Sequence, residues 1–225
     1  MKRVGMIILI GIFAVAVNGC ALNFYKGKPE QERKIKELTG QVEELERARM
    51  LLEDRLAKEI ADKQILLETT SRGLVITMAN DILFDSGKAK LKHEAHSVLK
   101  RIASVINEAA PDRNIGVEGH TDNVPIKYSG WKSNWELSTT RATSVLHYLI
   151  DECGIQPHKL SAIGYGEFRP ITLNDTKSGR AKNRRVEIII LPKEIAKKSY
   201  EEAQARMSEE ARTAEESKIT EGQVK

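Results

Sequence analysis

The fold is decided by Val117-Glu118-Gly119-His120-Thr121-Asp122-Asn123, residues 117–123. A strand is expected over 115–121, which includes the first part of this stretch. The polar residues at its end are typical of a loop, which we expect to run over 122–132. Asp122 is therefore expected just past the end of a central strand.

Strands and helices alternate on both sides of this stretch. Ser133 and Glu136 fit a capping box that starts a helix over about 133–152, and Gly154 suits its C-terminal cap. The other elements, predicted from β-branched runs and apolar periodicity, are strands at 74–78, 160–165 and 185–191, a helix at about 89–109 and a short helix within 166–183. This order predicts an α/β domain over 72–192.

Composition divides the chain into a packed middle and charged flanks. Charged residues make up 30% of the 225 residues and crowd into 28–70 and 193–225, so these segments are expected to bury little. A net charge of +4, spread among many acidic residues, excludes the concentrated basic face of a nucleic-acid binder. The two cysteines lack the spacing of a zinc site, and no cofactor or metal is expected.

The N-terminus predicts a lipoprotein signal peptide over 1–19. Two basic residues precede an apolar run, 4–17, that is too short to span a bilayer comfortably. The run ends in Val17-Asn18-Gly19-Cys20, which resembles the bacterial lipobox, in which the cysteine thiol receives the lipid. Cys20 is therefore the expected lipidation site, carrying acyl chains such as palmitate that hold the protein on a membrane. The alternative is an uncleaved signal anchor with an incidental cysteine.

A lipidated linker over 20–28 is expected to lead into a helical spacer over 29–71. Apolar residues recur there at alternating spacings of three and four, which predicts a short coiled coil and self-association through residues 29–70; the alternative is a solvated single helix. The residues of this seam are Ile35, Leu38, Val42, Leu45, Leu52 and Leu56. The charged tail over 193–225 is expected to be helical or disordered.

Four motifs occur in a fixed order along the predicted domain. They are 82–87 (ILFDSG), 117–123 (VEGHTDN), 134–142 (NWELSTTRA) and 183–188 (NRRVEI). Together they resemble the peptidoglycan-binding domain shared by OmpA, Pal and MotB, and the resemblance extends over 74–191. The resemblance implies an α+β sandwich of the form β-α-β-α-β-β, with helices on one face of a mixed sheet. The loop Val124 to Lys132 is longer than in the plainer OmpA and Pal pattern and is MotB-like. Its apolar residues are expected either to cover a crevice or to pack on their own domain.

The resemblance implies binding of the peptide stem of peptidoglycan through diaminopimelate, whose free end carries an ammonium and a carboxylate. Asp122 matches the aspartate that takes the ammonium, and Arg141 matches the arginine that takes the carboxylate. Arginine suits that role because its planar fork binds a carboxylate bidentately. Thr121, Asn123, Asn134 and Arg184 match supporting positions. The alternative for the charged pair is an internal Asp122–Arg141 salt bridge.

The predicted function is that of an outer-membrane lipoprotein, facing the periplasm, that tethers the envelope to the cell wall without being an enzyme. Ala21 after the cysteine, rather than aspartate, favours the outer membrane by the sorting tendency of bacterial lipoproteins. The alternative is a MotB-type stator subunit, although residues 4–17 contain no carboxylate to carry protons. A wall hydrolase is disfavoured because the histidines show no zinc-ligand spacing, and His120 is expected to be structural.

Overall fold

The computed structural model describes residues 29–127 and 129–193. The chain divides into two compact units, Met1–Val42 and Glu43–Lys225. In the first unit the described residues form the start of helix α2 (Pro29–Arg55). None of the described helices has both the length and the apolar character needed to cross a membrane.

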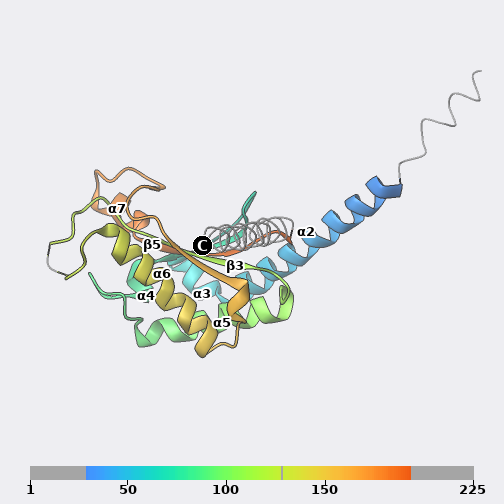
Figure 1. Ribbon diagram of the computed structural model, residues 1–225, viewed down its shortest axis with the longest axis horizontal. Coiled ribbons are helices and arrows are strands. Elements are labelled where there is room, and N and C mark those ends of the chain that lie inside the picture. The colour runs from blue at the N-terminus through green and yellow to red at the C-terminus, as the bar shows by residue number, and fades with distance from the viewer. Residues whose placement is uncertain (1–28, 128, 194–225) are drawn as a thin grey trace, which may run out of the picture. The chain divides into compact units, whose positions relative to one another are not determined.

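The second unit is built around a five-stranded mixed sheet in the order β1-β2-β5-β3-β4 (Figure 1). Strands β2, β5 and β3 pair antiparallel, whereas β3 and β4 are parallel. The strands are β1 (Ile65–Thr70), β2 (Gly73–Ala79), β3 (Ile115–His120), β4 (Leu160–Gly164) and β5 (Arg185–Ile190). The helices are α3 (Ala57–Ala61), α4 (Asn80–Leu83), α5 (His93–Ala109), α6 (Asn134–Asp151) and α7 (Lys177–Asn183). The α/β class and the mixed sheet confirm the predicted fold.

The core lies between the helices and one face of the sheet. All six residues of β5 are buried, and alternate residues of the strand, Val186, Ile188 and Ile190, belong to the apolar core on one face of the sheet. Helices α5 and α6 lie on the same side of the sheet (Figure 1). Their apolar stripes, including Leu99 and Leu149, belong to the same buried cluster.

Helix α6 begins and ends where its local sequence predicts. The Ser133 hydroxyl accepts a hydrogen bond from the Trp135 amide at 3.1 Å and donates one to Glu136. At the other end, Gly154 adopts a φ of 71°, and the amide of Ile155 donates to the Leu149 carbonyl at 3.0 Å. These caps fix the length of the helix that carries Arg141.

The expected helix through Thr70 is wrong in its last part, because Ile65–Thr70 forms the edge strand β1. Helix α3 ends at Ala61, and β1 then pairs with β2 in a hairpin closed by Ser71 and Arg72. Gly73 after the turn has a φ of +118°, and a Cβ there would lie 2.1 Å from the Ile190 carbonyl oxygen. The hairpin was missed because Ile65-Leu66-Leu67 also fits an apolar helical face.

The second half of the predicted coiled-coil seam packs into the domain. Ala48, Leu52 and Leu56 are fully buried in the same core as the sheet residues. The Arg55 guanidinium at the end of α2 donates to Glu108 on α5 at 2.5 Å. The domain therefore includes residues well before the predicted boundary at 72. Ile35, Leu38 and Val42 are exposed, and self-association through them stays a prediction.

Candidate functional site

Three neighbouring strands present polar residues at the same end of the sheet. Ala79 on β2 and His120 on β3 both pair with Arg185, the first residue of β5. The residues just beyond these ends are Asn80 after β2, Thr121 and Asp122 after β3, and Arg184 before β5. The register of the sheet thus gathers side chains that are distant in the sequence.

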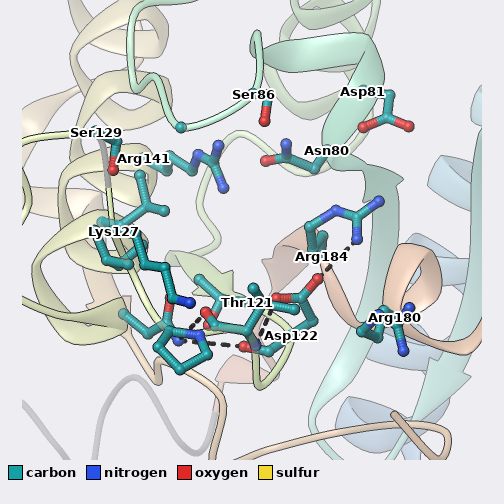
Figure 2. A pocket seen from close by; sticks show the side chains of 16 residues that line it. Asn80, Asp81, Ser86, Thr121, Asp122, Lys127, Ser129, Arg141, Arg180 and Arg184 are labelled. Carbon is teal, nitrogen blue, oxygen red and sulfur yellow. Dashed lines mark hydrogen bonds and ion pairs between the residues drawn. The ribbon is translucent and has the colours of Figure 1, made fainter. Parts of the chain in front are cut away.

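These residues line a pocket of about 640 Å³ (Figure 2). Its lining includes five of the six predicted binding residues: Thr121, Asp122, Asn134, Arg141 and Arg184. Asn123 is exposed and lies outside the lining, and its role in binding stays a prediction. The volume is in the range of pockets that hold drug-sized ligands, about 300–1,000 Å³.

Asp122 is engaged by two groups of the protein. Its Oδ2 atom accepts a hydrogen bond from Nη1 of Arg184 at 2.7 Å, and Oδ1 accepts one from the Val124 amide at 3.1 Å. The alternative of an internal Asp122–Arg141 salt bridge is wrong, because the ion pair forms with Arg184. A carboxylate has about four lone-pair sites, so Asp122 keeps capacity for a ligand donor.

Arg141 is buried in the pocket wall without a carboxylate partner among the described residues. Its Nε donates to the Lys88 carbonyl at 2.9 Å and Nη2 to the Asp85 carbonyl at 3.5 Å. The guanidinium lies 5.2 Å from the centre of the Phe84 ring. Burial, and to a smaller extent repulsion from Arg184, lowers the pKa of Arg141 to about 10. The side chain is still charged at neutral pH, and a carboxylate would compensate it.

A close approach of α6 to the sheet sets the position of Arg141. A Cβ on Gly119 would lie 2.1 Å from the carbonyl oxygen of Ser138, one turn before Arg141. The same helix passes Gly164 on β4, where a Cβ would lie 2.4 Å from the Thr139 amide nitrogen. Glycine at both positions lets the helix backbone rest on two strands.

The loop between β3 and α6 forms one wall of the pocket. The Asn134 amide donates to the Asp122 carbonyl at 3.3 Å, to the Val124 carbonyl at 3.2 Å and to Glu167 at 2.8 Å. The Trp131 indole donates to the Gly87 carbonyl at 2.8 Å, which ties the loop to the segment before α5. Of the apolar loop residues, Val124, Pro125 and Ile126 line the pocket, and Tyr128 lies outside the described residues.

The sequence reasoning missed several lining residues. Asn80, Asp81, Ser86, Lys127, Leu137 and Arg180 also line the pocket. Asn80 and Asp81 follow β2 directly, and a polar pair at the end of a buried strand was a usable signal. Among the lining side chains, four are cationic (Lys127, Arg141, Arg180 and Arg184) and two are anionic (Asp81 and Asp122), so the pocket favours an anionic group.

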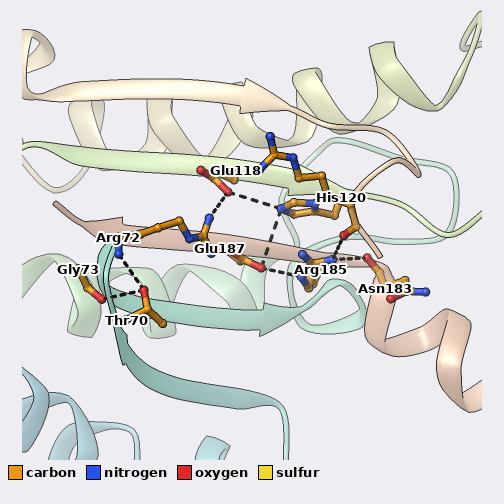
Figure 3. Close-up of polar contacts among 9 residues, drawn as sticks. Thr70, Arg72, Gly73, Glu118, His120, Asn183, Arg185 and Glu187 are labelled. Carbon is orange, nitrogen blue, oxygen red and sulfur yellow. Dashed lines mark hydrogen bonds and ion pairs between the residues drawn. The ribbon is translucent and has the colours of Figure 1, made fainter. Parts of the chain in front are cut away.

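A second polar cluster lies on the sheet face opposite α5 and α6 (Figure 3). Arg72 donates to Glu118 at 2.8 Å and to Glu187 at 2.6 Å, and Arg185 donates to Glu187 at 2.7 Å. His120 is buried beside both carboxylates, and burial lowers its pKa. The three acceptor residues have the composition of a metal site, but two guanidinium groups already balance the two carboxylates. We assign the cluster a structural role.

Of the two cysteines, Cys20 and Cys153, the structure describes only Cys153. Cys20 lies outside the described residues, so its lipidation stays a prediction. Cys153 is a free, partly buried thiol after α6, and burial raises its pKa. A raised pKa lowers the thiolate fraction and makes this thiol a poor nucleophile at neutral pH.

Comparison with known proteins adds independent information on this domain. Residues 83–184 match the OmpA family. The chain is 44% identical over 156 residues to Motility protein B of Bacillus subtilis, covering 68% of this chain and 59% of that protein. It is 32% identical over 140 residues to the Probable lipoprotein YiaD of Escherichia coli, covering 62% and 61% respectively. The chain thus spans less than two thirds of these relatives.

A solved structure shares the same architecture. The cell wall anchor of the T6SS from Pseudomonas aeruginosa superposes with a TM-score of 0.57 at 33% identity. The match covers 63% of this chain and 96% of that chain. The chain therefore shares its fold with this cell wall anchor.

Proposed function

Because the chain belongs to the OmpA family, we propose that its domain binds the peptide stem of peptidoglycan non-covalently and anchors a membrane to the cell wall. The observation that carries this proposal is Arg141, a buried cation in a pocket wall without a carboxylate partner among the described residues. A buried charge of this kind is stabilised when a ligand supplies the opposite charge. The domain is accordingly a binding module rather than an enzyme.

The pocket suits the zwitterionic end of diaminopimelate. The Arg141 guanidinium would take the carboxylate in a bidentate contact. Asp122, which retains lone pairs beyond those used by Arg184 and Val124, would take the ammonium. Thr121 and Asn134 line the same pocket and would hold the ligand beside them.

Retention on purified peptidoglycan tests this function. Wild type should sediment with the polymer, whereas Asp122→Ala and Arg141→Ala should remain in the supernatant. Gln156→Ala is the control, because this amide side chain is exposed and lies outside the lining. Equal retention of all four proteins would refute the assignment of the site.

For the membrane attachment, we propose lipidation at Cys20 and a place on the outer membrane, with the domain facing the periplasm. The lipobox-like sequence before Cys20 and the similarity to the Probable lipoprotein YiaD support it. Metabolic labelling with palmitate tests it. Wild type should incorporate the label and Cys20→Ser should not; an unlabelled wild type would contradict lipidation.

A stator subunit is the second candidate, favoured by the 44% identity to Motility protein B. Peptidoglycan binding serves both functions, so the retention assay does not separate them. The palmitate experiment does, because a stator subunit is held by a membrane-spanning segment instead of acyl chains. Restored motility on expression in a strain that lacks its own stator subunit would support this second candidate.

A further inference from the structure

Asn80 has a buried amide side chain in the pocket wall, and it lies outside the four sequence motifs described above. It is 4% exposed, and its Oδ1 atom has no hydrogen-bond partner. The backbone amide of Asn80 donates to the Arg184 carbonyl at 3.0 Å, so the residue is fixed to the start of β5 while its side chain lines the pocket (Figure 2).

A second unpaired polar atom belongs to Thr121, which follows the end of β3 at the same edge of the sheet. Thr121 is also 4% exposed, and its Oγ1 has no partner. Buried polar groups without partners cost free energy and are rare in native proteins, so two of them in one pocket point to a ligand that pairs with them. Both residues are held by backbone bonds, because the Thr121 amide donates to the Gly166 carbonyl at 2.9 Å.

Resting on the proposed function, we propose that Asn80 and Thr121 each bind a peptide group of the stem, so that the pocket recognises diaminopimelate as part of a peptide. An amide side chain offers both a donor and an acceptor, and so does a peptide group. Asn80 is neutral, whereas the charged end of the ligand is matched by Arg141 and Asp122. The neutral Asn80 amide is therefore suited to a neutral peptide group of the ligand.

The dimensions of the site agree with a peptide ligand. Asn80 and Thr121 follow strands that flank β5, and two strand spacings amount to about 10 Å. Three residues of extended chain also span about 10 Å. A pocket of about 640 Å³ has room for more than one residue.

Calorimetric titration of the full-length protein with two probes tests the inference. The probes are a stem tripeptide that ends in diaminopimelate, and free diaminopimelate, which carries the zwitterion without a peptide bond. Asn80→Ala should weaken tripeptide binding about tenfold and change binding of the free amino acid by less than about twofold. Gln156→Ala, an exposed amide outside the pocket, should change neither.

The outcomes separate this inference from the proposed function. Equal weakening of both probes, or no change in either, would overturn the role of Asn80 while leaving the charged pair in place. A wild-type protein that binds neither probe would overturn the proposed function and this inference with it. Asn80→Ala breaks no hydrogen bond at Oδ1, and thermal melting checks that the variant folds. If it does not fold, Asn80→Ser replaces it in the same titrations.

Discussion

Asp122 pairs with Arg184, with 2.7 Å between Oδ2 and Nη1, and leaves Arg141 without a carboxylate partner among the described residues. The two arginines in the pocket are therefore not equivalent. Arg184 neutralises a carboxylate of the protein, whereas Arg141 contacts carbonyl groups and an aromatic ring. Arg184 stabilises the pocket without a ligand, and Arg141 is available to an anionic ligand.

Removing Arg184 should destabilise the folded protein. Arg184→Ala leaves Asp122, which is 7% exposed, as a buried carboxylate without its counterion. We expect the free energy of unfolding to fall by about 1–3 kcal/mol, less than for a fully buried pair because Arg184 is partly exposed. Urea unfolding measures the change. Arg180→Ala, which lines the same pocket but forms no ion pair with a described residue, should cost less than about 1 kcal/mol.

Replacing Arg141 by lysine should weaken binding although the charge is kept. Lysine lacks the planar fork that pairs with a carboxylate, and it cannot reproduce both bonds to the Lys88 and Asp85 carbonyls. We expect the Kd for free diaminopimelate to rise about tenfold in calorimetric titration. Arg169→Lys, which changes a guanidinium stacked on Tyr165 outside the pocket, is the control. An unchanged Kd for Arg141→Lys would show that charge alone suffices.

A side chain at Gly119 should force α6 away from the sheet. The added Cβ of Gly119→Ala meets the Ser138 carbonyl at 2.1 Å, and we expect a loss of about 1–3 kcal/mol in stability together with weaker ligand binding. Gly116→Ala on the same strand is the matched control, since its Cβ would meet nothing closer than 3.9 Å. Similar effects of the two substitutions would show that strand propensity, rather than the contact with α6, is responsible.

The ends of helix α6 could be predicted from the sequence because the residues that cap a helix lie next to it in the chain. Ser133 and Gly154 cap α6 through their own neighbours, so a pattern of a few residues was sufficient. Strand β1 was missed because an apolar run beside a helix fits either element, and its pairing with β2 settles the choice. A pairing partner is information that a single segment does not contain.

The site was predicted in part for the same reason. The motifs gave Asp122 and Arg141, and the structure brings both to one pocket. The ion pair of Asp122 with Arg184 depends on β5 lying beside β3, which the order of elements along the chain does not give. The place of Asn80 in the pocket likewise depends on the ends of β2 and β3 lying beside the start of β5.

Acidification should destabilise the domain through His120. Burial lowers the pKa of His120 below its usual value of 6.5, so the unfolded chain binds a proton more readily than the folded protein. Stability is then fully present above pH 6.5 and decreases as the pH falls below it. The pKa values of Glu118 and Glu187 are lowered despite their burial, by the neighbouring His120 and by hydrogen bonds from Arg72, and they add a further loss below their usual value of 4.5.

The histidine contribution can be isolated between pH 7 and pH 5. His120→Gln removes the titrating group, so its unfolding free energy should vary less with pH over this range than that of wild type. His158→Gln changes an exposed histidine and should follow wild type. Urea unfolding at a series of pH values provides the comparison. A wild-type stability that is flat over this range would contradict the prediction.

Leu52 distinguishes a helix that belongs to the domain from a helix that serves mainly as a coiled coil. Its side chain is fully buried in the domain core, so Leu52→Ala should lower the free energy of unfolding by about 2–5 kcal/mol. Ile35→Ala, at a position of the same seam that is 64% exposed, should have little effect on the monomer. Urea unfolding at two protein concentrations tenfold apart separates the explanations. A loss that is independent of concentration places Leu52 in the core, whereas a loss that depends on concentration would show that burial of Leu52 requires a second chain.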